Sequence, residues 1–424
     1  MYVLEVEIEN IRSLDHARWE IPPARAPGWH VILGENGAGK STFLRAIALA
    51  LVGPAEAPGL RQDWNQWLRR GADKGHVSLQ LDFDRTRDRF SGQGRPPKNY
   101  YLPAAVSLRR NGEVTLRGES SGDLPAERHT WGGKRGWFAA SYGPFRRFQG
   151  GNPEVEKLYH AQPRLARHLS VFGENVALSE PLAWLTRLDH ERQRGNQRSA
   201  RLLDQITKFI NQPGFLPNQV RLHRISDKGV EFRDANGSAI LVEELSDGYR
   251  SLLSMTFELL RQLVACYGQA GVFRPRDATR VAAPGVVLID EVDAHLHPSW
   301  QRELGLWMRK HFPRIQFIVT THSPLICQAA DVGSVWCLPR PGTDEEGRML
   351  TGGQLERVLY GDPVEAYEST AFNLQTLRSD HANRLLSELT SLNQRALTRK
   401  LSATQRKRQN ALRALFPSAA AGFP

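Results

Sequence analysis

The sequence of 424 residues contains only three cysteines, Cys266, Cys327 and Cys337. They form neither a metal-ligand pair nor a disulfide framework, which is typical of a protein from a reducing compartment. No apolar run approaches the roughly 20 residues that are needed to span a bilayer. Residues 1–10 alternate like a strand and do not resemble a signal peptide. We therefore expect a soluble, cytoplasmic protein without a membrane partner.

Lysine is also scarce, with ten residues, so arginine supplies nearly all of the basic charge behind the net charge of +11. The total can reflect codon bias, and the clustering of the charge is more informative. No acidic residue follows Glu388, although this tail is rich in basic residues. Such a cluster is typical of a surface that binds nucleic acid or an acidic partner, and a solvated helix face remains an equal alternative. The basic residues are Arg395, Arg399, Lys400, Arg406, Lys407, Arg408 and Arg413.

The most informative motif is Gly34-Glu35-Asn36-Gly37-Ala38-Gly39-Lys40-Ser41. It lies between a short apolar run at 30–33 and a helical run at 42–51, which is the strand, loop and helix order of a P-loop. Lys40 is predicted to reach the β- and γ-phosphates of ATP and to be catalytic, while Ser41 holds Mg²⁺. The predicted nucleotide-binding residues here are Gly34, Asn36, Gly37, Ala38, Gly39, Lys40, Ser41 and Thr42.

Two adjacent carboxylates, Asp290 and Glu291, follow the unbroken apolar run at 286–289, which is typical of a strand buried on both faces. At the end of such a strand, Asp290 can hold Mg²⁺ and Glu291 can take the proton from an attacking water. With Asp293 these acids also resemble those of a two-metal nuclease. The phosphate loop upstream favours the ATPase interpretation.

His322 follows the next apolar strand, 315–319, in the segment Thr320-Thr321-His322-Ser323-Pro324. The carboxyl edge of such a sheet is where ligands of α/β folds bind. An imidazole at this edge can hydrogen-bond the γ-phosphate or the attacking water, so His322 is a predicted catalytic residue.

The remaining sequence predicts an α/β chain. Alternating strands are expected at 2–9 and 77–83, and a hairpin at 106–116 with the positive φ angles of a tight turn at Asn111-Gly112. The polar segment 85–98 is expected to be a loop, and another strand is expected at 137–141. Residues 153–212 predict two or three helices without the sustained heptads of a coiled-coil arm. A helix should begin at Ser246, whose hydroxyl suits an N-cap, and Pro298 should open another.

In this order the motifs resemble the ATP-binding-cassette (ABC) ATPases, and the details are similar to the branch that includes RecF and the chromosome-maintenance (SMC) proteins. The supporting segments are Glu7-Ile-Glu-Asn-Ile-Arg12-Ser13, the phosphate loop, and Asp290 to Pro298. The resemblance implies a P-loop fold with a mixed central sheet, an antiparallel β lobe and a helical lobe. Residues 1–340 would form this domain, with a β-rich lobe at about 76–141, a helical insertion at about 153–212 and a signature lobe at about 219–340. Residues 341–424 would form a helical basic tail.

The same resemblance assigns further roles. Leu245, Ser246, Asp247 and Gly248 would be the signature that faces the ATP held by Lys40 of a second copy, which makes the protein a homodimer or a higher even oligomer. Arg12 would contact the nucleotide, and Asp293 would lie in the loop that signals across the dimer. Gln149 would be the glutamine-loop ligand of Mg²⁺, although Arg146 and Arg147 compete for that place.

Small members of this branch without coiled-coil arms include ATPases of bacterial phage defence, such as the Septu ATPase that pairs with a separate nuclease. The resemblance therefore implies an ATPase that couples nucleotide state to DNA sensing and to a partner effector. Alternatives are a RecF-like DNA repair ATPase and a regulatory scaffold that binds only protein. A metal site at His295 and His297 is a weaker alternative, because the local sequence offers no third ligand.

Overall fold

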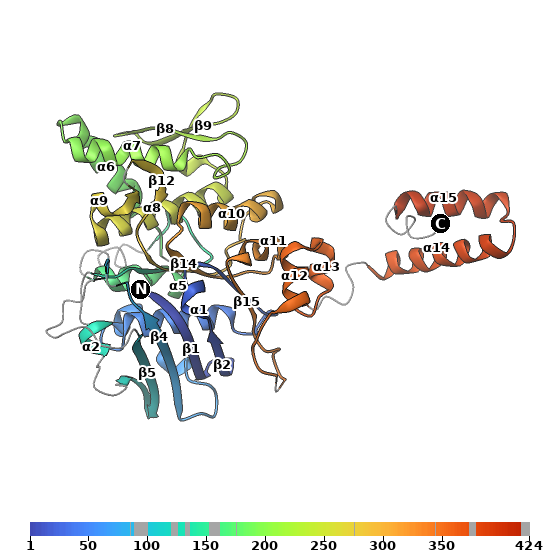
Figure 1. The fold of residues 1–424 in the computed structure, drawn as a ribbon, viewed down its shortest axis with the longest axis horizontal. Coiled ribbons are helices and arrows are strands. Elements are labelled where there is room, and N and C mark those ends of the chain that lie inside the picture. The colour runs from blue at the N-terminus through green and yellow to red at the C-terminus, as the bar shows by residue number, and fades with distance from the viewer. Residues whose placement is uncertain are drawn as a thin grey trace.

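The computed structural model contains two large sheets, a helical lobe above them that carries two small sheets, and a separate helical hairpin at the C-terminus (Figure 1). The described residues are 1–84, 86–88, 101–119, 126–131, 136–151, 162–174, 176–274, 276–343, 345–372 and 379–416. Most of the predicted loop at 85–98 and the start of the predicted helical region, 153–161, lie outside them. Within the described residues, no helix is long and apolar enough to cross a membrane.

The first sheet is antiparallel, with the strand order β2-β1-β4-β5-β6. Apolar side chains alternate along β4, so that Val77, Leu79 and Leu81 face the core. The hairpin of β5 and β6 is the predicted one, but only Gly112 has a positive φ (81°), whereas Asn111 stays in the strand and pairs with Glu113. The strands are β1 (Tyr2–Ile11), β2 (Leu14–Glu20), β4 (Lys74–Asp82), β5 (Tyr101–Asn111) and β6 (Glu113–Glu119).

The second sheet has the order β16-β15-β3-β14-β13-β7, and all of its strand pairs are parallel except β15 with β16. The apolar run of β13 is buried on both faces: Val286 and Leu288 belong to one core, and Val287 and Ile289 to the other. This division explains why the run has no polar position. The strands are β3 (Gly28–Leu33), β7 (Ala139–Tyr142), β13 (Gly285–Ile289), β14 (Ile315–Thr320), β15 (Gly333–Cys337) and β16 (Arg348–Met349).

Helix α1 (Lys40–Val52) lies between the two sheets and is buried along nearly its whole length. The core on this side also contains the inner face of the antiparallel sheet. Short helices complete this half: α2 (Ala126–His129), α4 (Pro163–Ala166) and α5 (Leu169–Phe172).

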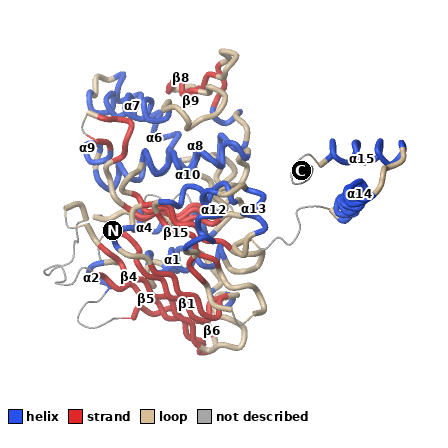
Figure 2. The backbone as a smooth tube through the Cα atoms, turned by 45° about the vertical axis from the view of Figure 1, so that its right-hand side comes forward, coloured by secondary structure: helices blue, strands red, loops and turns tan. Residues whose placement is uncertain are grey.

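The helical lobe covers the other face of the parallel sheet (Figure 2). Its central helix is α8 (Asp247–Tyr267), which runs beside α10 (Pro298–His311). Above them lie α6 (Glu180–Gln193) and α7 (Gln197–Ile210), an antiparallel pair of 14 residues each. The small strands are β8 (Arg221–Ser226), β9 (Gly229–Arg233), β10 (Ala239–Leu241), β11 (Phe273–Arg274) and β12 (Asp277–Val281), with α9 (Gln269–Val272) beside them.

After the sheets, α11 (Pro324–Cys327), α12 (Gly352–Tyr360) and α13 (Pro363–Glu368) pack on the body. The predicted helical tail ends in a hairpin of α14 (Asp380–Thr398) and α15 (Ala403–Leu415), which lies apart from the body in both views (Figures 1 and 2). The hairpin has its own small core of Leu389, Leu392 and Leu412.

The predicted architecture, an α/β chain with a mixed central sheet, an antiparallel β lobe, a helical lobe and a helical tail, is confirmed. The lobe boundaries were incomplete in one respect. A strand was expected at 2–9, which is β1, and none was predicted at β2; both strands belong to the antiparallel lobe that the sequence placed at about 76–141. Pairing between strands more than 60 residues apart leaves no local signal in a single sequence.

Candidate nucleotide-binding site

The order of the parallel sheet brings the sequence motifs together. Strands β3, β14 and β13 are neighbours and run in the same direction, so their carboxyl ends lie at one edge. The phosphate loop follows β3, the segment Thr320 to Ser323 ends β14, and Asp290 and Glu291 follow β13. This edge is where α/β sheets bind their ligands.

The loop of residues 34–39 has the geometry of a phosphate cradle. Gly37 and Gly39 have φ values of 81° and 98°, which only glycine adopts without strain. Helix α1 begins directly after Gly39 without a side-chain cap, so the N–H groups of its first turn are available to an anion. The Nζ atom of Lys40 donates to the carbonyl oxygens of Gly34 (2.8 Å) and Glu35 (3.0 Å), and lies over the loop. These features fit a bound triphosphate.

The electrostatics of Lys40 reflect its neighbours. Burial lowers the pKa of Lys40, while Asp290, Glu291 and Asp293 raise it. The three carboxylates therefore act on the ammonium group that lies over the phosphate loop. They also supply oxygen ligands of the kind that Mg²⁺ takes beside phosphates.

Asp290 is held rigidly at the strand end. Its side chain is buried, and Oδ1 accepts a hydrogen bond from Thr320 Oγ1 at 2.6 Å. The same Thr320 oxygen accepts the backbone N–H of Glu291 at 2.8 Å. Thr320 thus joins the end of β14 to both predicted acids, with the second Asp290 oxygen left for another ligand such as a metal-bound water.

Glu291 is exposed and has a φ of 46°, in the left-handed region that disfavours a side chain. A non-glycine residue keeps this conformation only where its surroundings hold it, which is characteristic of functional sites. The hydrogen bond from its N–H to Thr320 is one such restraint. The carboxylate of Glu291 is therefore presented at the sheet edge by a turn that the neighbouring strand fixes.

His322 follows Thr321 at the end of β14, between the phosphate loop and the two acids in the sheet order. Desolvation and then the charge of Lys40 lower the pKa of His322, against the raising effect of the acids. The imidazole is therefore neutral at pH 7, with one N–H donor and one acceptor.

Arg12 lies in the tight turn between β1 and β2 with a φ of 50°. Its guanidinium stacks over the ring of Trp67 at 4.7 Å. It lines a cleft of about 860 Å³ together with Gly37 and Ala38 of the phosphate loop. The cleft therefore places Arg12 beside the phosphate loop, and its contact with the nucleotide stays a prediction.

The signature segment lies at the start of α8. Ser246 occupies the N-cap position, as predicted, but its hydroxyl makes no cap hydrogen bond to the described residues of its helix. Leu245 is buried, Ser246 and Asp247 are exposed, and Asp247 pairs with Arg250. A Cβ on Gly248 would meet the carbonyl oxygen of His295 at 2.7 Å, so only glycine allows α8 to pack on this loop.

The loop after Glu291 gives little support to a metal site. His297 caps α10: its Nδ1 accepts the backbone N–H of Ser299 at 3.3 Å and the Ser299 hydroxyl lies at 2.8 Å. His295 has a φ of 65° and lies against Gly248 through its backbone. Asp293, by contrast, has a buried Oδ1 atom without a hydrogen-bond partner among the described residues.

Gln149 is exposed and lines a cavity of about 390 Å³ with Asp247, Arg250 and His295, on the signature side of the sheet edge. No phosphate-loop residue lines this cavity, so the role of Gln149 as a Mg²⁺ ligand stays a prediction. Arg146, its competitor in the sequence, is buried against Asp290 and Glu291. No motif indicated these contacts, because Arg146 lies more than 140 residues before the acids.

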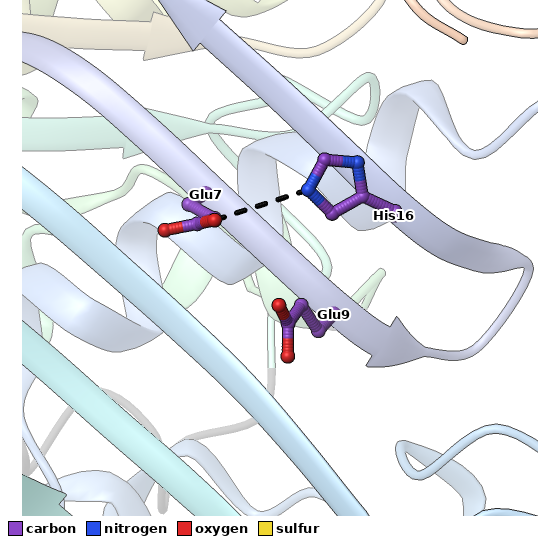
Figure 3. Close-up of side chains that lie close together, drawn as sticks. All are labelled: Glu7, Glu9 and His16. Carbon is purple, nitrogen blue, oxygen red and sulfur yellow. Dashed lines mark ion pairs between the residues drawn. The ribbon is translucent and has the colours of Figure 1, made fainter.

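A small polar cluster lies on the exposed side of the antiparallel sheet. Glu7 and Glu9 of β1 and His16 of β2 lie close together, with 3.8 Å between His16 Nε2 and Glu7 Oε1 (Figure 3). A half-buried and an exposed carboxylate beside a histidine are ordinary on a solvated strand pair. We assign no function to this cluster.

Two sequence families match the chain. The family described as "AAA domain, putative AbiEii toxin, Type IV TA system" matches residues 145–328, and a family described as "AAA domain" matches residues 5–118. The first match contains the signature and both acids, and the second contains the phosphate loop.

Among characterised proteins, the Septu protein PtuA of Bacillus mycoides is 27% identical over 79% of this chain and 40% of its own length. The "Retron Ec83 probable ATPase" of Escherichia coli is 24% identical over 79% of this chain and 71% of its own length. The chain thus spans well under half of that PtuA. Among solved structures, an SMC head bound to the C-terminal winged-helix domain of ScpA superposes with a TM-score of 0.50 at 16% identity, over 82% of this chain and 98% of the other.

The fold is therefore that of an ABC-type ATPase head of the kind found in SMC proteins. In sequence, the chain is similar to the Septu protein PtuA and to a retron probable ATPase.

Proposed function

We propose that this chain binds ATP with Mg²⁺ and hydrolyses it at the interface of a two-fold dimer. The observation that carries the proposal is the adjacency of β3, β14 and β13, whose carboxyl ends bear the phosphate loop, His322 and the acids. A catalytic base, a neutral histidine and a cation beside a phosphate cradle are the parts that phosphoryl transfer needs. The family matches to AAA domains support the same activity.

Each residue has a role that its geometry suits. Lys40 and the first N–H groups of α1 bind the β- and γ-phosphates, and Ser41 and Asp290 hold the Mg²⁺ that neutralises their charge. Glu291 takes the proton of the attacking water. His322, neutral at pH 7, donates a hydrogen bond to the γ-phosphate or to the water.

The proposed dimer is supported by two features of the signature segment, the Ser246 hydroxyl and the first turn of α8. The Ser246 hydroxyl is exposed and forms no cap bond to described residues, and the first turn of α8 carries the partial positive charge of a helix N-terminus. In the proposed dimer, Ser246 and Gly248 of one protomer face the γ-phosphate bound by Lys40 of the other. Neither half-site then hydrolyses ATP alone.

Glu291→Gln tests this mechanism. The substitution keeps the shape of the side chain but removes the base, so ATP binding is retained and turnover falls by at least about 10²-fold. Mass photometry with ATP should show an accumulated dimer. The matched control is Glu291→Gln combined with Lys40→Ala, which should bind no ATP and remain monomeric. A Glu291→Gln protein that turns over ATP at the wild-type rate would contradict the assignment.

We further infer that the nucleotide state of the dimer controls DNA binding and a separate effector protein, as part of bacterial defence against phage. The similarity to PtuA and to a retron ATPase over 79% of this chain supports the defence setting. The basic hairpin of α14 and α15 supports a nucleic-acid partner. A pull-down from the native host should recover a nuclease or another effector in only one of two conditions, with or without ATP, because the dimer forms only when ATP is bound.

Two alternatives make different predictions. A RecF-like repair ATPase would be encoded beside replication genes and would bind DNA gaps or junctions without an effector. A protein-only scaffold would hold an acidic partner on the basic hairpin, and polyanionic competitors that mimic a phosphate backbone would leave its complex intact.

A further inference from the structure

Arg146 is a buried cation at the centre of the proposed ATPase site. It lies in the turn after β7, with 5% of its surface exposed. Its guanidinium donates four hydrogen bonds to described residues, and every acceptor is neutral. They are the carbonyl oxygens of Gly143 (3.0 Å), Asp290 (2.9 Å) and Glu291 (3.1 Å) and the Ser251 hydroxyl (3.0 Å).

The guanidinium keeps its charge in this position. Burial lowers the pKa of Arg146 to about 10, and the charges of Asp290, Asp293 and Glu291 oppose the shift. Burying a cation without a carboxylate in contact opposes folding unless hydrogen bonds compensate. The four hydrogen bonds supply this compensation. They tie the guanidinium to three backbone carbonyl groups and to the Ser251 hydroxyl.

The acceptors come from three segments that nucleotide hydrolysis has to coordinate. One is the turn after β7 itself, and the second is the turn of Asp290 and Glu291. The third is α8, where Ser251 is buried and lies five residues after Ser246 of the signature. Gly248 packs on the carbonyl of His295, so α8 contacts the loop after the acids directly and is linked to the acids' own turn through Arg146.

The contact with Glu291 bears on its backbone conformation. Glu291 has a φ of 46°, which its side chain disfavours. Hydrogen bonds hold the residue on its two sides: Thr320 Oγ1 accepts its N–H, and its carbonyl oxygen accepts from Arg146 Nη2 and from the Ala294 N–H. Loss of the Arg146 bond would remove the restraint that connects this turn to Ser251 of α8.

We propose that Arg146 is a positioning residue that fixes the Glu291 carboxylate in register with the signature helix of the same protomer. Movement of α8 onto the γ-phosphate held by a partner and placement of the base then occur together. This inference rests on the proposed ATPase function. It adds a residue whose guanidinium is buried and which acts through Glu291 and Ser251.

Ser251→Ala and Arg146→Lys test the inference in the full-length protein. Ser251→Ala removes one acceptor and leaves the guanidinium in place, whereas lysine cannot span all the acceptors at once. The control is Thr256→Val, because the buried Thr256 hydroxyl lies on the same helix and has no hydrogen-bond partner among the described residues. The measurements are kcat and KM for ATP, ATP affinity with a fluorescent analogue, and the melting temperature.

Both test variants should lower kcat by about 10-fold or more and leave ATP affinity within about 3-fold of wild type, because positioning acts on the chemical step. Thr256→Val should match wild type. In a Glu291→Gln background, Arg146→Lys should cause no further loss of turnover, since both changes act through the same carboxylate.

Three outcomes would overturn the inference. If Ser251→Ala behaves like Thr256→Val, or if kcat, ATP affinity and melting temperature fall together, Arg146 is only structural. If the effects of Glu291→Gln and Arg146→Lys are additive, Arg146 does not act through Glu291. In both cases the ATPase proposal stands, whereas a wild-type protein without ATP turnover would overturn the proposed function itself and this inference with it.

Discussion

His30 lies in β3, immediately before the phosphate loop, and has no exposed surface. Its Nε2 donates to the carbonyl oxygen of Ala26 (3.1 Å), and Ser334 Oγ lies 2.9 Å from its Nδ1. Both bonds suit a neutral imidazole. Burial, assisted by the charge of Arg25, lowers the pKa of His30 to about 4. Protonation of His30 would therefore oppose the packing of β3 in acid.

We predict a loss of stability between pH 6.5 and pH 4 that depends on His30. In this window the unfolded chain binds a proton at His30 that the folded chain does not, so the free energy of unfolding falls as the pH falls. A shift from 6.5 to about 4 corresponds to a change on the order of 3 kcal/mol. Urea unfolding of wild type and His30→Gln across this range measures it. Equal pH dependence in the two proteins would contradict the assignment.

At this scale the sequence predicted most of the site. Lys40, Asp290, Glu291 and His322 each follow a recognisable strand, and the sheet order brings these strand ends together. The contacts of Arg146 could not be predicted, because its partners lie more than 100 residues further along the chain. Only the tertiary fold shows which of several arginines reaches them.

The phosphate loop and α1 act as one element, and Gly39 fixes their position. A Cβ on Gly39 would lie 2.8 Å from Ser13 Oγ, in the turn that joins β1 and β2, and 2.7 Å from Cδ2 of Leu14, the first residue of β2. Gly37 has a similar positive φ but no atom within 4 Å of its added Cβ. The two glycines therefore differ in packing, and they share the need for a left-handed conformation.

We predict that Gly39→Ala impairs ATP binding more than Gly37→Ala. The left-handed conformation costs alanine roughly 1–2 kcal/mol at either position. Only at position 39 does the methyl group also push the loop away from Ser13 and Leu14. Isothermal titration with ATP and thermal melting of both variants test this. A Gly37→Ala protein that binds ATP as poorly as Gly39→Ala would show that packing under the loop is unimportant.

Element boundaries were predictable where side chains act locally. Pro298 opens α10 as predicted, and the apolar run before Asp290 is a strand. The hydroxyl of Ser246 was expected to cap α8, but it forms no cap bond to described residues. An N-cap serine normally accepts a backbone N–H with its side-chain oxygen. Ser246 departs from this rule among the described residues, and it lies in the segment that we propose faces the ATP of the second protomer.

Over the whole molecule, the head and the C-terminal hairpin are separate packing units. In the hairpin, Arg408 pairs with Glu388, and Arg413 bonds to Asn393. At the bend, Arg399, Lys400 and Arg406 line a cavity of about 350 Å³ and form no ion pair with described residues. These three cations are available to a polyanion such as a phosphate backbone.

We predict that glutamine at positions 399, 400 and 406 weakens DNA binding and its salt dependence. Each lost contact with duplex phosphate should reduce the slope of log K against log salt by about 0.9. The control variant carries glutamine at Arg194, Arg198 and Arg201, which are exposed residues where α6 and α7 join. It has the same change in net charge. Fluorescence anisotropy at several salt concentrations measures both slopes. Equal slopes for the two variants would rule out the bend as the DNA contact.

At this scale the sequence predicted the class of fold, because the motif order is diagnostic. It did not predict the membership of β1 and β2 in the antiparallel lobe, nor the separation of the hairpin from the head. Both depend on which surfaces pack over long separations along the chain.

The central claim is that each ATP is hydrolysed by parts of two protomers. Its most direct test is turnover per protomer, measured over a dilution series for wild type and for Ser246→Arg. We predict that wild-type turnover per protomer falls on dilution, and that Ser246→Arg binds ATP yet hydrolyses almost none at any concentration. Turnover that is independent of concentration, together with full activity in Ser246→Arg, would contradict the account.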